Sequence, residues 1–117
     1  MVVHPSLSNA ALDQLFHALA DTTRRDIIAR LMGGEHATVT SLASRYDMSF
    51  AAVQKHVSVL EEAGLVTKHP QGRERIVRGN PERLARARAL LSTLEQLWSA
   101  RFSQLDAILA EPPRRTD

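Results

Sequence analysis

The amino-acid sequence predicts a mainly helical fold with one small β-hairpin. Apolar residues recur at helical spacing over most of the chain, and the period changes only between about residues 65 and 78. Residues that favour helix N-caps, such as Asp21 and Ser49, stand before the periodic stretches. The 117 residues suggest one domain, and with only 4% aromatic residues its core must be built mostly from Leu, Val, Ile and Ala.

Three helices are expected in the first half of the chain. The first covers residues 10–20, where four apolar side chains fall at helical spacing: Leu12, Leu15, Phe16 and Leu19. Asp21 can cap a second helix, lined by Ile27, Ile28 and Leu31, which Gly33-Gly34 ends. Thr38 or Thr40 can cap a short third helix, with Val39, Leu42 and Ala43 facing inward, that stops near Tyr46-Asp47.

A fourth helix is expected over residues 49–63, with Ser49 as its cap and Gly64 as the left-handed residue after its end. Its inward stripe is Val53, Val57 and Leu60. Basic residues lie in its first half and acidic residues in its last turn, although the helix dipole favours the reverse. This charge order leaves a positive front end that is suited to an anionic partner.

A β-hairpin follows, from residue 65 to residue 78. Its two strand-like stretches are residues 65–68 and 73–78, and Pro70-Gln71-Gly72 between them has turn chemistry. Four basic residues and one acid, Glu74, lie in or beside it: Lys68, Arg73, Arg75 and Arg78. The hairpin therefore has a basic tip and flank.

The last predicted helix runs from about residue 81 to residue 110. Four of its apolar residues are seven apart: Leu84, Leu91, Trp98 and Leu105. Leu94 and Ile108 take the complementary position, which Ala87 and Arg101 fill only weakly, so the seam is an imperfect heptad repeat. Residues 1–9 are expected to form a flexible arm, residues 10–110 the folded domain and residues 111–117 a polar tail.

Two short helices about three residues apart, the second with a polar outward face, form a helix-turn-helix, whose second helix enters the major groove of DNA with its N-terminus leading. Gln54 can pair with adenine, Lys55 with guanine or phosphate, and Ser58 with either type of base edge. The residues predicted to contact DNA are Ser49, Phe50, Ala51, Gln54, Lys55, His56 and Ser58 on the helix and Lys68, Arg73 and Arg75 on the hairpin. The alternative is that these are ordinary solvated residues.

The order of elements and three stretches resemble the ArsR/SmtB family of winged helix-turn-helix transcriptional regulators: FHALADTTRRDIIARL (16–31), VTSLASRYDMSFAAVQKHVSVLEEAGLV (39–66) and GRERIVR (72–78). The resemblance covers about residues 10–110. It implies five helices plus a wing, and a homodimer held by the first and last helices that binds an operator, usually to repress. The expected dimer residues are Leu12, Leu15, Phe16, Leu91, Leu94, Trp98, Leu105 and Ile108.

Many members of that family sense metals, but the ligand residues differ in this chain. It has no cysteine, its last helix has no histidine, and no two of its five histidines are three or four residues apart. We therefore expect no metal and no cofactor. No nucleophile–base pair or phosphate-binding loop indicates an enzyme.

Double-stranded operator DNA and a second copy of the chain are the expected partners. No apolar run is long enough to cross a membrane, and the N-terminus does not resemble a signal peptide, so we expect a cytoplasmic protein with no membrane partner. The alternatives are a winged-helix module for protein–protein contact and a MarR-like regulator that responds to a small molecule.

Overall fold

The computed structural model describes residues 7–110, so most of the expected N-terminal arm and the C-terminal tail lie outside the described residues. The chain divides into two compact units, residues 1–87 and residues 88–117, and the domain expected over residues 10–110 spans both. Among the helices of residues 7–110, none is long and apolar enough to span a membrane.

Four helices of the first unit begin at capping side chains. They are α1 (Asn9–Leu19), α2 (Thr22–Met32), α3 (Val39–Ala43) and α4 (Phe50–Glu62). Their N-caps are Ser8, Asp21, Thr38 and Ser49, and each side-chain oxygen accepts a hydrogen bond from a backbone N–H three residues later. The sequence predicted the caps of α2 and α4, and it left the choice between Thr38 and Thr40 open for α3.

α3 is shorter than the sequence predicted. It ends at Ala43 rather than near Tyr46-Asp47, because residues 44–48 form the turn that leads into α4. The hydroxyl of Tyr46 in this turn donates a 2.5 Å hydrogen bond to Asp26 Oδ2 of α2, and so ties the turn to the neighbouring helix.

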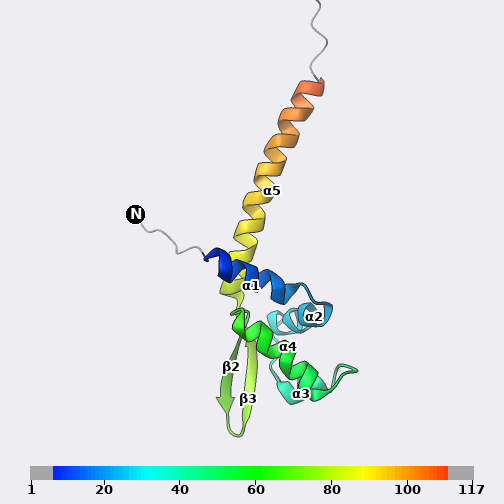
Figure 1. The fold of residues 1–117 in the computed structure, drawn as a ribbon, viewed down its shortest axis with the longest axis vertical. Helices are drawn as coiled ribbons and strands as arrows, with labels where there is room; N and C mark the ends of the chain where they lie inside the picture. The colour runs from blue at the N-terminus through cyan, green and yellow to red at the C-terminus, as the bar shows by residue number, and fades with distance from the viewer. Residues whose placement is uncertain (1–6, 111–117) are drawn as a thin grey trace, which may run out of the picture. The chain divides into compact units, whose positions relative to one another are not determined.

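A three-stranded antiparallel sheet completes the first unit, with β1 (Ala37–Thr38), β2 (Val66–Gln71) and β3 (Glu74–Gly79) in the order β1-β3-β2. β2 and β3 form the predicted hairpin, which is labelled in Figure 1. Its turn is Gly72-Arg73, where Gly72 has a φ of +64°. The sequence did not predict β1, since two residues are too few to show a period of two.

One cluster of buried apolar side chains joins the helices to the sheet. Its members are Leu15, Ala18, Ile27, Ile28, Leu31, Ala37, Leu42, Val53, Val57, Leu60, Ala63, Leu65, Val66, Val77 and Ala87. The predicted inward stripe of α4 belongs to it, and Val53, Val57 and Leu60 are each 0% exposed. The core therefore sets which face of α4 points outward.

The long helix α5 (Pro81–Ala110) begins in the first unit, which includes it up to Ala87. Just before it, Asn80 Nδ2 donates to the carbonyl oxygen of Gly64 at 3.0 Å, and within it Arg83 Nε donates to that of Ala63 at 3.1 Å. These two bonds satisfy carbonyls at the C-terminal end of α4, where a helix lacks partners of its own.

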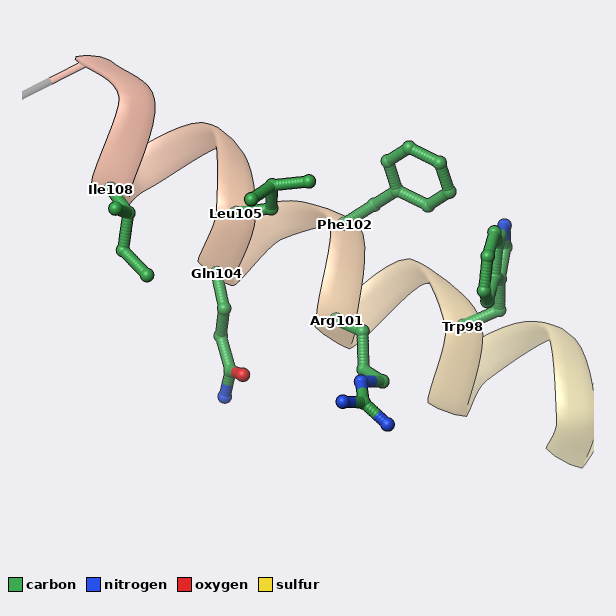
Figure 2. Close-up of a pocket in the computed structure, with 6 residues that line it drawn as sticks. All are labelled: Trp98, Arg101, Phe102, Gln104, Leu105 and Ile108. Atoms are coloured by element: carbon green, nitrogen blue, oxygen red, sulfur yellow. The ribbon is translucent and has the colours of Figure 1, made fainter.

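From Leu91 to Ala110, α5 is exposed on all its faces. Its large exposed apolar residues are Leu91, Leu94, Leu97, Trp98, Phe102, Leu105, Ile108 and Leu109. The rings of Trp98 and Phe102 pack edge to face, with centroids 4.8 Å apart. In Figure 2 these two rings and Leu105 project to one side of the helix, while Arg101, Gln104 and Ile108 project to the other.

Candidate nucleic-acid interface

The front end of α4 is open to solvent and carries no acidic residue in its first turn. Phe50 is 49% exposed, and Ala51, Gln54 and Lys55 are also exposed, whereas Ser58 is half-buried. The unpaired N–H groups of the first turn carry partial positive charge, to which Lys55 adds a full one. This end of the helix can therefore accept an anion or a base edge.

A shallow groove brings this helix together with the hairpin. It is lined by Phe50 and Gln54 of α4, Lys68, Arg73, Glu74 and Arg75 of the hairpin, and Thr38, Val39 and Thr40 at the start of α3. The structure thus gathers five of the ten predicted DNA-contact residues on one surface. The sequence analysis did not assign the residues from Thr38 to Thr40 to this site, because their proximity depends on β1 pairing with β3.

Lys68 is less available than the sequence suggested. Its side chain is only 15% exposed, and its Nζ lies 3.4 Å from Glu61 Oε1 at the end of α4. Glu61 thus pairs with the hairpin, which partly explains why an acid is present in the last turn of this helix. In the groove, Arg73 and Arg75 at the tip of the hairpin are the exposed cations.

His56 does not share the outward face of α4. At about 100° per residue, it lies roughly 160° around the helix axis from the face that Ala51, Gln54 and Ser58 form. Its side chain is 21% exposed, and its Nδ1 lies 3.2 Å from Arg24 Nη1 and 3.8 Å from Asp21 Oδ2. The structure therefore places His56 against α2, away from the groove where the other predicted contacts gather.

Arg24 is a residue of this region that the sequence analysis missed. Its Nε donates to the carbonyl oxygen of Ala18 at 2.7 Å, and its Nη2 donates to that of His17 at 3.1 Å. One guanidinium thus connects the end of α1, the start of α2 and the middle of α4. The only signal in the sequence is its place in the TTRR stretch after Asp21, which belongs to the family resemblance.

A second polar cluster holds the turn between α3 and α4. Arg30 Nε lies 3.0 Å from Asp26 Oδ2, which also accepts the Tyr46 hydrogen bond. The Tyr46 hydroxyl and then the Arg30 guanidinium stabilise the carboxylate and so lower the pKa of Asp26. Burial, and then the hydrogen bond to Asp26, raise the pKa of Tyr46. The cluster fixes the turn before the front end of α4.

The residues predicted at a dimer interface differ in exposure. Leu15 is 0% exposed and packs in the core of the first unit, so within a single chain it offers no surface to a partner. Helical spacing does not distinguish a core face from an adjoining one, so the sequence pattern groups Leu15 with Leu12 and Phe16. Leu12 and Phe16 are half-buried, and the five assigned residues of α5 are 49–67% exposed.

Residues 7–110 contain no group of three or more His, Cys, Asp or Glu side chains that could hold a metal ion. The hollow beside Trp98 and Phe102 is lined only by residues of α5, as Figure 2 shows, so it is the surface of one helix rather than an enclosed ligand site.

Comparison with known proteins connects this geometry to a family. A helix-turn-helix domain family matches residues 19–69. The HTH-type regulator YuzN of Bacillus subtilis is 42% identical over 82 residues, which cover 65% of this chain and 89% of YuzN. The arsenical resistance operon repressor of Escherichia coli is 28% identical over 102 residues, which cover 87% of this chain and 85% of the repressor.

Solved structures agree in fold. The crystal structure of an ArsR family transcriptional regulator, RHA00566, superposes with a TM-score of 0.72 at 36% identity, covering 81% of this chain and 97% of that one. A homodimeric winged helix-turn-helix domain of Mycobacterium bovis, solved by NMR, has a TM-score of 0.58 at 25% identity, covering 82% and 91% of the two chains. The chain therefore belongs to the ArsR family of winged helix-turn-helix transcriptional regulators, proteins that bind DNA and are not enzymes.

Proposed function

We propose that this protein is a homodimeric repressor that binds a palindromic operator, with α4 in the major groove and the β2–β3 wing beside it. The observation that carries the DNA-binding surface is the groove that Phe50, Gln54, Arg73 and Arg75 line together. In this reading Gln54, Lys55 and Ser58 read base edges, and Phe50 and Ala51 meet thymine methyl groups. Ser49, Arg73 and Arg75 bind the phosphate backbone.

Two of the predicted contacts, Lys68 and His56, should contribute less to direct DNA binding than the sequence suggested. To contact DNA, the Lys68 ammonium must either break its ion pair with Glu61 or divide its charge between Glu61 and a phosphate. Its contribution is therefore smaller than that of a free lysine. His56 acts from behind the recognition face, through its contact with Arg24.

The apolar surface of α5 supports the dimer. Leu91, Leu94, Trp98, Leu105 and Ile108 are all about half exposed or more, and exposed apolar patches of this kind mark interaction surfaces. A two-fold dimer would present two copies of α4, and half-sites about one helical turn of DNA apart would match them. The M. bovis relative is homodimeric, and the E. coli relative is an operon repressor.

DNA selection and sedimentation test this proposal. Selection from a pool of random duplexes should recover a palindrome, and footprinting on it should protect two half-sites. Sedimentation at micromolar concentration should give about twice the chain mass of 13.0 kDa. Leu94→Glu should shift the protein to monomer, whereas Gln96→Glu, about 200° away around the helix, should not. A wild-type monomer, or no recovered sequence, would refute the corresponding half of the proposal.

A further inference from the structure

We propose that Arg24 is a positioning residue for DNA recognition: through His56 it fixes the rotation of α4 about its own axis, and thereby sets where Gln54 meets the bases. This rests on the proposed function, because it assumes that α4 reads DNA. The inference follows from three hydrogen bonds of one guanidinium, which connect the end of α1 to the recognition helix.

The remaining contacts of α4 explain why a positioning residue is needed. Its inner face packs through Val53, Val57 and Leu60, which selects the face that points outward, but the hydrophobic effect is not directional and adds no hydrogen bond that fixes the last few degrees of rotation. The ion pair of Glu61 and the carbonyl contacts of Ala63 and Gly64 act only at its C-terminal end. The bond from Arg24 to His56 is therefore a directional contact near the base-reading residues.

The chemistry of the pair makes the contact specific. Arginine has five N–H donors and no acceptor, so in this hydrogen bond Nδ1 of His56 must be the acceptor. The ring proton then lies on Nε2. Because Arg24 Nε and Nη2 already bind the carbonyls of Ala18 and His17, the guanidinium has little freedom to follow the imidazole if α4 turns.

A small rotation of α4 about its axis is enough to lower its specificity for the operator sequence. Side-chain tips lie about 5–6 Å from a helix axis, so a 10° rotation of α4 would move the Gln54 carboxamide by about 1 Å. Hydrogen bonds to base edges tolerate only about 0.5 Å. Long wing residues such as Arg75 can follow a phosphate over that distance. Loss of the contact should therefore lower operator affinity and leave binding to random DNA almost unchanged.

Arg25 offers a matched control. It is the next residue of α2, and its Nη1 donates to the carbonyl oxygen of Leu19 at 2.9 Å, so it also ties α2 to the end of α1. Its side-chain hydrogen bonds go to Leu19 and Thr22, and not to α4. Arg25→Met thus removes a similar tie without touching the recognition helix.

The test compares the affinities of the full chain for two duplexes of equal length, the palindrome recovered by selection and a scrambled version of it. Arg24→Met and His56→Leu should each lower the operator-to-scrambled affinity ratio roughly tenfold, the loss of about one base contact. Arg25→Met should leave the ratio within about twofold of wild type. His56→Asn, whose amide oxygen is attached to Cγ as Nδ1 is and can still accept from Arg24, should retain most of the ratio. The double variant Arg24→Met/His56→Leu should lose no more than either single variant.

A merely structural role gives a different result. If Arg24 only stabilised the fold, Arg24→Met would lower the affinity for both duplexes by the same factor, and the ratio would not change. An unchanged ratio, an equal loss in Arg25→Met, or an equal loss in His56→Asn and His56→Leu would each overturn the inference. Should Arg24→Met not fold, the two His56 variants decide the question alone. If the wild-type protein shows no preference between the duplexes, the proposed function fails instead.

Discussion

Replacing Gly64 by alanine should destabilise the protein through two separable effects. Gly64 follows α4 with a φ of +77°, a conformation that costs an L-residue with a side chain about 1–2 kcal/mol. A Cβ at this position would also lie 2.5 Å from Arg83 Nε, so the guanidinium would have to move. Its hydrogen bond to the carbonyl oxygen of Ala63 would then be lost, at about 0.5–1.5 kcal/mol. We expect a total loss of about 2–3 kcal/mol.

Gly72 separates these two effects. Its φ is +64°, and a Cβ there would meet no atom within 4 Å, so Gly72→Ala should show the backbone cost alone. Any entropy change that alanine causes in the unfolded chain is common to both variants and cancels in their difference. Gly64→Ala should therefore exceed Gly72→Ala by about 1 kcal/mol, the value of one hydrogen bond.

Urea unfolding at one fixed protein concentration is the assay, because association would make the midpoint depend on concentration. In an Arg83→Ala background the alanine at position 64 has no guanidinium to displace, so the difference between the two glycine positions should disappear. Equal losses in Gly64→Ala and Gly72→Ala, or a difference that persists without Arg83, would refute this reasoning.

Three further predictions concern DNA, metals and acid. Gln54→Ala should lower operator affinity by roughly 1–3 kcal/mol and relax the preference at one base pair per half-site. Arg75→Ala should weaken binding to all DNA sequences about equally and reduce the slope of log affinity against log salt concentration by about one. If the two variants behave alike on operator and random duplexes, these roles are wrong. Zinc, nickel, cadmium and arsenite at micromolar free concentration should change operator affinity by less than about twofold. A tenfold effect that a chelator reverses would overturn the expectation that the protein senses no metal. Since the folded pKa of Asp26 lies below the unfolded value of 3.8, its stabilisation is complete above that value and is lost as the pH falls through the folded pKa. The difference in unfolding free energy between wild type and Tyr46→Phe should accordingly be largest near neutral pH and shrink in acid, and a difference independent of pH would argue against the Tyr46–Asp26 bond.

The sequence alone determined the features that depend on neighbours a few residues apart. Asp21 and Ser49 cap their helices because a short oxygen-bearing side chain reaches the N–H three residues on. Gly64 ends α4 because it tolerates a positive φ. The spacing of Val53 and Val57 selected the inner face of α4, and hence its outer face. Together with the family resemblance, these local signals predicted the fold class and most of the surface proposed to bind DNA.

Only the tertiary structure decided which polar groups meet across elements. Arg24 and His56 are 32 residues apart, and Lys68 finds Glu61 on another element, so neither pair leaves a local pattern. Leu15 has the same helical spacing as its half-buried neighbours Leu12 and Phe16, and only the packing of α1 on the core shows that it is fully buried. The two-residue strand β1 exists because β3 offers it an edge. Local propensity acts over one turn of a helix or one hairpin, whereas these contacts depend on how whole elements pack, and that packing aligns α4 with the wing.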